Sequence, residues 1–182
     1  MIATAPPLFA RVLGATLAQT PPCVQRLHGG APLARYRGEV EVERGAGLLA
    51  RVLARATFLP PAGRGPVEVE IAARDGRERW VRRIGGRAMP SRLWARRNDP
   101  RLWERLGPVV FGFGLRVEDG AILWWVENVR VLGLLPLPSR WFRAVRCRES
   151  GDGDGDRYRF DVRAELPGIG LLVHYRGWLA VP

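Results

Sequence analysis

From residue 66 to the C-terminus the chain alternates apolar and polar residues with a period of two, as the two faces of a β-strand require. Turn signals interrupt this alternation at Asp75-Gly76, at Asp119-Gly120 and in the acidic glycine run of residues 151–156. Asp-Gly pairs readily adopt the positive φ angles of tight hairpin turns. The pattern therefore predicts a sheet built mainly of antiparallel hairpins.

Two of the predicted strands indicate the shape of this sheet. Residues 158–166 alternate so cleanly that one face must be core and the other solvent. Residues 109–117 carry an apolar face, and their other face includes Gly112 and Gly114. Glycine inside a strand marks a bend, a bulge or a close backbone approach, so we expect a strongly curved sheet.

Helical spacing occurs mainly before the sheet. Residues 8–17 predict an amphipathic helix that ends before Pro21-Pro22, and residues 24–28 a shorter one. A connecting turn of helix is predicted over residues 98–106. A further helix is expected between two strands, with Arg51 and Arg55 toward water and an apolar stripe toward the core formed by Leu48, Leu49, Val52, Leu53 and Ala56.

The expected fold class is α+β and β-rich: a large, strongly curved antiparallel sheet, half-barrel to barrel-like, with two or three helices. We count about nine strands. The 182 residues suit one domain, with an N-terminal helical segment over 1–30 and a sheet-rich body over 31–182. A chain of this length buries roughly two thirds of its unfolded surface and needs no disulfide or metal to fold.

The net charge indicates which classes of partner the chain would attract. All 29 basic residues are arginine, and with 18 acidic residues they give a net charge of +11. Such a charge favours association with nucleic acid, anionic lipid or acidic ligands without choosing between them. Cys23 and Cys147 have no second thiol or histidine at ligand spacing, and no secretory signal or membrane span is recognised. We expect a cytoplasmic protein that needs no cofactor.

Short sequence motifs in a fixed order resemble those of a known family. They include Pro21-Pro22-Cys23, Tyr36-Arg37-Gly38, Arg82-Arg83-Ile84-Gly85-Gly86, residues 133–138 (GLLPLP) and the closing Tyr175-Arg176-Gly177-Trp178. The chain resembles the bacterial domain-of-unknown-function family 4166 over nearly its whole length. The resemblance implies no catalytic residue. It implies a domain found alone or beside a dinucleotide-binding reductase-like partner domain, in a supporting or ligand-holding role.

If the sheet curls around a cavity, polar groups among apolar walls would orient a small ligand. His174 and Arg176 in the last strand, and Glu127 or Asn128 in a tryptophan-rich strand, are the polar residues expected to face inward. The alternative is that such groups are satisfied by neighbouring backbone or arginine. The predicted ligand-binding residues are Phe113, Trp124, Trp125, Glu127, Asn128, His174 and Arg176. We expect noncatalytic binding of a small hydrophobic or amphipathic molecule.

Three other features suggest catalysis or metal binding, and each has a structural alternative. His28 has no assignable nucleophile or orienting acid, so a capping role in the second helix is preferred. Cys147 is flanked by arginines that favour a thiolate, but an inert packed thiol is the commoner case. The acidic run begins like a calcium loop, yet Arg157 and Arg163 stand where glycine and glutamate are needed, which favours a disordered hairpin loop. No metal is expected.

A basic segment, residues 77–105, provides the alternative function. It holds ten arginines against three acidic residues, interleaved with Trp80, Trp94 and Trp103. Arginine and aromatic groups on one face would bind single-stranded nucleic acid, an acidic partner or an anionic membrane surface. Strand alternation also allows the tryptophans to turn into the core while the arginines are solvated.

Overall fold

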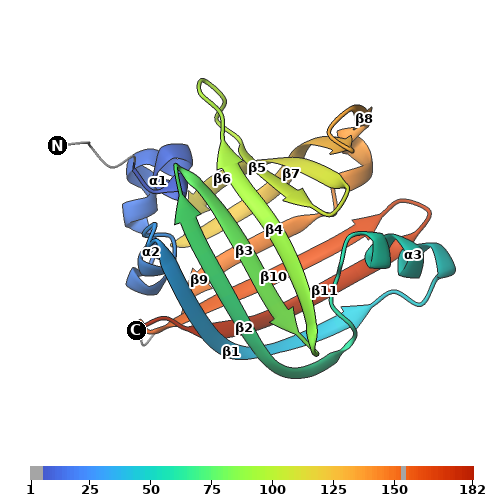
Figure 1. The fold of residues 1–182 in the computed structure, drawn as a ribbon, viewed down its shortest axis with the longest axis horizontal. Coiled ribbons are helices and arrows are strands. Elements are labelled where there is room, and N and C mark those ends of the chain that lie inside the picture. Colours follow the sequence, from blue (N-terminus) through green and yellow to red (C-terminus); the bar gives the residue numbers. More distant parts are fainter. Residues whose placement is uncertain (1–5, 153–154) are drawn as a thin grey trace.

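The computed structural model describes residues 6–152 and 155–182 and shows a closed antiparallel β-barrel (Figure 1). Ten of the described strands form the ring in the order β6-β5-β4-β3-β2-β1-β11-β10-β9-β7, and β6 pairs with β7 to close it. The predicted curved antiparallel sheet is confirmed. The strands are β1 (Leu33–Arg44), β2 (Gly63–Arg74), β3 (Arg77–Ile84), β4 (Arg87–Ala95), β5 (Leu102–Leu106), β6 (Val109–Glu118), β7 (Ala121–Val131), β8 (Leu135–Leu137), β9 (Arg146–Gly151), β10 (Arg157–Leu166) and β11 (Gly170–Ala180).

Two segments differ from the sequence prediction. Residues 98–106 were expected to form a turn of helix, but Leu102–Leu106 is strand β5, paired with β4 on one side and β6 on the other. Five residues are too few for a period to be read reliably, and pairing on both edges satisfies the backbone groups of this short segment. The stretch 134–138, which its two prolines predict to be an irregular connection, contains strand β8, which extends the edge of β7 beyond β9.

The glycines of β6 mark an irregularity, as expected. The register between β6 and β7 shifts between Gly112 and Phe113. A Cβ at Gly114 would overlap the indole ring of Trp125 on the neighbouring strand. A bulge with a close approach raises the local twist, which helps this side of the barrel to close.

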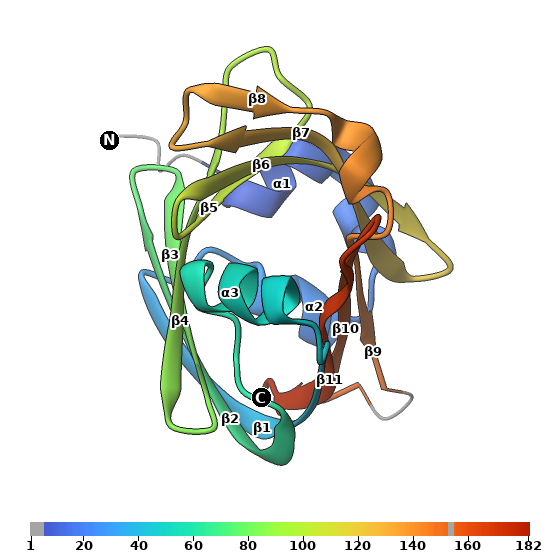
Figure 2. The ribbon, with the colours of Figure 1, turned by 90° about the vertical axis from the view of Figure 1, so that its right-hand side faces the viewer.

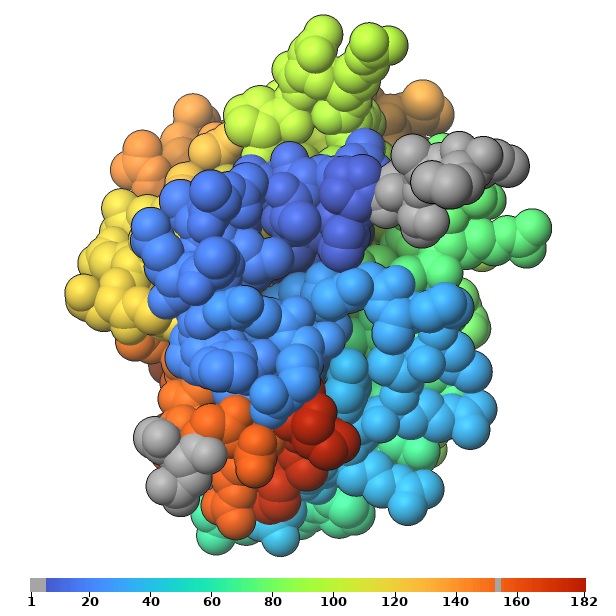
Figure 3. All heavy atoms as spheres, turned by 90° about the vertical axis from the view of Figure 1, so that its left-hand side faces the viewer, coloured from blue at the N-terminus to red at the C-terminus, as the bar shows by residue number. Residues whose placement is uncertain are grey.

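The N-terminal helices close one end of the barrel. Space-filling atoms of this segment cover that end in Figure 3. Phe9, Cys23 and Val24 are completely buried there, because the helices insert their apolar faces between the strands. We call these helices the plug; its elements are α1 (Leu8–Leu13), the 3₁₀ helix η1 (Gly14–Gln19) and α2 (Pro22–Leu27).

The opposite end is crossed by α3 (Leu48–Ala56), between β1 and β2 (Figure 2). The helix was predicted correctly, but the expected orientation of its apolar stripe is wrong. Ala50 and Ala54 are buried, whereas Leu48 is 77% exposed and Val52 54% exposed. Small alanines let the helix lie close to the barrel, which leaves the larger side chains outside.

Candidate functional site

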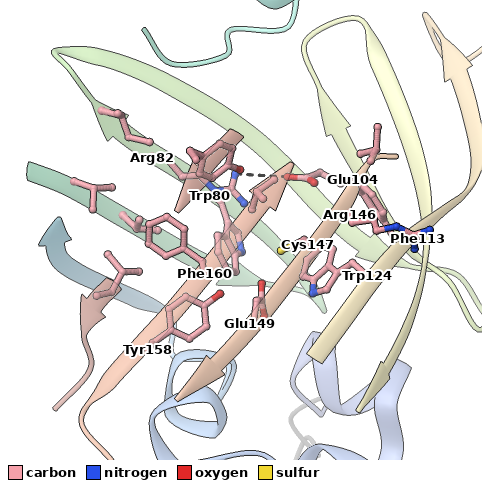
Figure 4. A pocket seen from close by; sticks show the side chains of 17 residues that line it. Trp80, Arg82, Glu104, Phe113, Trp124, Arg146, Cys147, Glu149, Tyr158 and Phe160 are labelled. Atoms are coloured by element: carbon pink, nitrogen blue, oxygen red, sulfur yellow. Dashed lines mark ion pairs between the residues drawn. The ribbon is translucent and has the colours of Figure 1, made fainter. Parts of the chain in front are cut away.

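The barrel encloses a cavity of about 90 Å³ between the plug and the α3 end. Figure 4 shows side chains from several strands converging on it. Most are apolar, and four are charged. The lining residues are Val67, Val69, Trp80, Arg82, Ile84, Glu104, Phe113, Trp124, Val145, Arg146, Cys147, Glu149, Tyr158, Phe160, Val162, Tyr175 and Leu179. This volume holds roughly six water molecules or one small organic molecule.

Arg82 and Glu104 form the charged pair inside the cavity, marked by the dashed line in Figure 4. Arg82 Nη1 lies 3.5 Å from Glu104 Oε1, and the two side chains are only 14% and 12% exposed. Arg82 also donates to Ser91 Oγ at 3.0 Å. Burial, the largest single effect, lowers the pKa of Arg82, but Glu104 together with the nearby Tyr175, Tyr158 and Cys147 outweighs it, so the pKa is raised and the cation persists. The cavity therefore contains a permanent hydrogen-bond donor.

A second polar group lies at the plug side of the cavity. His28, the residue that follows α2, places Nε2 2.8 Å from Glu149 Oε2, and both side chains are buried. Tyr158 hydrogen-bonds Glu149, and its pKa is raised well above the usual value, chiefly by burial and also by the Glu149 charge. Phe9 packs on the His28 ring at a centroid distance of 3.5 Å. His28 is thus fixed between plug and wall rather than free to act as a base.

Glu78 extends this polar layer on β3. It is buried and accepts a hydrogen bond from Trp80 Nε1 at 2.8 Å. Burial raises the pKa of Glu78, and the hydrogen bond from Trp80 offsets only part of that effect. The indole of Trp80, held in this way, forms part of the cavity wall.

Trp124 on β7 carries an unsatisfied donor. Its Nε1 is buried without a hydrogen-bond partner among the described residues. Leaving a buried donor unpaired costs about 1–3 kcal/mol. Trp124 is among the residues that line the cavity, but its Nε1 atom is itself buried.

Two observations concern nucleophilic and metal chemistry in the cavity. Burial raises the pKa of Cys147 well above its usual value, so the thiol stays protonated despite the neighbouring arginines. Within residues 6–152 and 155–182 there is no group of three histidine, cysteine or acidic side chains able to hold a metal ion. Among these residues no helix is long and apolar enough to cross a bilayer.

Residues 21–179 match the family described as Domain of unknown function (DUF4166). The chain belongs to the DUF4166 family. A search of curated proteins gives no match. Among solved structures the chain is similar to the crystal structure of Rv2717c from M. tuberculosis, with 12% identity and a TM-score of 0.46, covering 90% of this chain and 99% of that one.

In this DUF4166 domain two of the seven predicted ligand-binding residues line the cavity. These are Phe113 and Trp124, whose rings meet edge to face at 5.5 Å. Trp125 projects to the outer surface, where its Nε1 donates to Glu127 Oε1 at 3.0 Å. Asn128 lies opposite Gly112 and is absent from the lining.

The expected inward orientation of His174 and Arg176 needs correction. The interior side of β11 carries Val173, Tyr175 and Leu179, so the alternate residues face outward. His174 pairs with Asp161 at 2.9 Å on the outer surface. Arg176 pairs there with Glu41 and Glu43, each at 3.4 Å.

Several buried polar residues in or beside the cavity were missed from the sequence, although the signal was present. Glu78 and Arg82 share the strand face of Trp80, and Glu104 shares that of Leu102. Counting in twos along β3 and β5 places these charges inside the barrel. The partnership of His28 with Glu149 had no such signal, because 121 positions separate the two residues.

The basic segment 77–105 does not offer its tryptophans for stacking. Trp80 faces the cavity, and Trp103 is 1% exposed. Arg96 covers the Trp103 ring at 3.9 Å, and Trp94 stacks on it at 6.5 Å. Around Trp103 the arginine and aromatic side chains therefore pack on one another.

The acidic run is only partly described. Gly153 and Asp154 lie outside the described residues, so the expectation of a disordered loop falls partly beyond the structure. On either side, Asp152 pairs with Arg159 at 2.7 Å and Asp156 with Arg26 at 3.1 Å.

Proposed function

We propose that this DUF4166 domain binds a small apolar or amphipathic molecule inside its barrel and does not transform it. The observation that carries the proposal is the largely apolar cavity inside the barrel with a buried cation in its wall. Protein interiors are close-packed, so a cavity of this size with convergent polar groups suits a ligand.

The chemistry of the lining limits the ligand class. Phe113, Trp124 and Phe160 offer apolar and aromatic contact to a single ring or a short chain. The Arg82 guanidinium is a hydrogen-bond donor, which favours a carboxylate, carbonyl or similar acceptor on the ligand. Arg82 remains paired with Glu104, so a neutral acceptor or a single anion is accommodated better than a polyanion.

The protonation states of the buried groups support binding without catalysis. Cys147 and Tyr158 both have raised pKa values, so neither supplies an anionic nucleophile or base near neutral pH. His28 Nε2 is bonded to Glu149 behind the Phe9 ring. The walls therefore supply binding and orientation.

Native mass spectrometry of the purified protein, before and after denaturation, tests this proposal. We expect a small-molecule adduct that leaves the chain on unfolding. The double variant Arg82→Met/Glu104→Gln removes the charged pair without leaving either charge alone, and should carry less adduct. Arg92→Met, an exposed position on β4, is the matched control. Equal adduct in all three proteins would contradict a role for the charged pair.

A further inference from the structure

The exposed large apolar side chains of the domain gather at one end. Eight of the nine described residues of this kind lie at the α3 end, and the ninth, Leu33, begins β1 at the plug end. Three belong to α3: Leu48, Leu49 and Val52. Three more lie in and after the turn between β7 and β8: Leu132, Leu134 and Leu135, of which Leu134 is 83% exposed.

These two groups sit on the same open side of the barrel. Figure 1 places α3 and β8 on the right, and Figure 2, which looks at that side, shows α3 across the barrel opening and β8 along its upper rim. Phe58, just after α3, and Trp141, in the 3₁₀ helix η2 (Ser139–Phe142), add to the exposed apolar surface. Clustered apolar surface of this kind marks an interaction site, whereas scattered residues need no explanation.

The charge at this end is entirely positive in the segments that connect the strands. Connections 45–62, 85–86, 107–108, 132–145 and 167–169 contain Arg51, Arg55, Arg140 and Arg143 but no aspartate or glutamate. No carboxylate among the described residues pairs with these four arginines. The acids nearest in sequence are occupied: Arg163 binds Glu165 at 2.9 Å, and Arg176 binds Glu43.

The plug end differs in that acidic residues stand there beside arginines such as Arg11, Arg26 and Arg96. Its hairpin turns carry Asp75 and Asp119, and Asp156 lies in the connection before β10. The turns that carry aspartate and the connections that carry no acid thus lie at opposite ends of the barrel axis. A second copy fits the α3 end poorly, because two such surfaces would bring unpaired arginines together.

We propose that the α3 end docks on an anionic membrane surface. In this arrangement α3 lies in the headgroup region with Leu48, Leu49 and Val52 toward the acyl chains, and the β7–β8 turn provides a second anchor. Arg51 and Arg55 on the same helix contact lipid phosphates. Apolar side chains flanked by basic ones are the combination that holds short amphipathic helices at anionic interfaces. The proposal does not depend on a ligand in the cavity.

Vesicle co-sedimentation tests the proposal directly. We expect binding to phosphatidylcholine vesicles containing about one third phosphatidylglycerol, weaker binding at high salt, and little binding to phosphatidylcholine alone. Arg51→Gln/Arg55→Gln should lower the partition coefficient roughly 25-fold, from the worth of two basic residues near such a surface. Leu49→Ser/Val52→Ser should lower it by a similar factor.

Matched controls separate this surface from general charge and apolarity. Leu33→Ser removes an exposed leucine from the plug end, and Arg79→Gln/Arg92→Gln removes two exposed wall arginines, so both should bind like the wild type. The two α3 variants alter different chemistry at exposed sites, and a folding defect in one leaves the other as the test.

Three results would overturn the proposal. One is failure of the wild type to bind anionic vesicles. Another is equal loss of binding in Arg79→Gln/Arg92→Gln, which would place the contact on the basic wall. The third is a dimer that Leu49→Ser/Val52→Ser dissociates in light scattering, which would assign the apolar end to a second copy.

Discussion

His28 Nε2 lies 2.8 Å from Glu149 Oε2, and this bond joins the end of plug helix α2 to strand β9. The contact connects the N-terminal segment to the cavity wall across most of the sequence. Because Tyr158 shares Glu149, the plug, β9 and β10 meet at one buried carboxylate. The plug side of the cavity is therefore held together by a polar contact as well as by apolar packing.

Replacing His28 should be costly. His28→Ala leaves Glu149 buried without its main partner, and loss of one partner from a buried pair costs about 3–5 kcal/mol. The control is His174→Ala, whose partner Asp161 is about half exposed, so the loss should stay below about 1 kcal/mol. Urea unfolding measures both. Equal losses would show that the plug contact contributes no more than a surface pair.

Glu78 predicts a pH-dependent stability. Its pKa is higher in the folded protein, mainly because burial disfavours the charge, so its contribution is complete below the unfolded pKa and declines as pH rises through the folded pKa. Glu78→Gln stays neutral and keeps an oxygen acceptor for Trp80 Nε1. The free energy of unfolding of Glu78→Gln should therefore rise relative to that of the wild type as the pH increases from about 4 to about 7.

Urea unfolding across this pH range checks the prediction. Glu118→Gln, on the exposed end of β6, measures the effect of losing a surface carboxylate. If the stability of Glu78→Gln relative to the wild type does not increase with pH, ionisation of Glu78 is not the cause of the pH dependence.

Gly38 is required by the packing of β1 on β11. A Cβ there would overlap the carbonyl oxygen of Trp178, a backbone atom that has no freedom to move aside. Gly38→Ala should cost at least about 3 kcal/mol, or prevent folding. Gly65→Ala on neighbouring β2 meets open space and should change stability by less than about 0.5 kcal/mol. Thermal melting distinguishes the two, and a tolerated Gly38→Ala would mean that the strands lie further apart.

Both cysteines should be slow to react in the folded protein. Burial raises the pKa of Cys23, and raises that of Cys147 well above the usual value, so little thiolate is present. With Ellman's reagent at about pH 8, the thiols should react slowly in the native protein and at once in urea. Rapid native labelling of Cys147 would argue for a reactive thiol in the cavity.

The sequence allowed much of the barrel to be predicted, and the cavity only in part. Period-two patterns in β6 and β10 are long and unambiguous, whereas the five residues of β5 are too short to show a period. His174 was expected inside because polarity alone drew attention to it. Its neighbours Val173 and Tyr175, which are more apolar, decide the inner face of β11. The orientation of α3 depended on close packing of Ala50 and Ala54, which no spacing rule describes.

The central claim, a ligand inside the barrel, is tested most directly by an NMR titration with 4-fluorobenzoate, which joins one apolar ring to one carboxylate. We predict saturable shifts of the backbone amides of Val69, Phe113 and Cys147, with a dissociation constant of about 1 mM or tighter. The fluorine signal should broaden in the wild type and much less in Arg82→Met/Glu104→Gln. Shifts confined to outer residues such as His174 and Arg176, or no saturable shift at all, would contradict the account.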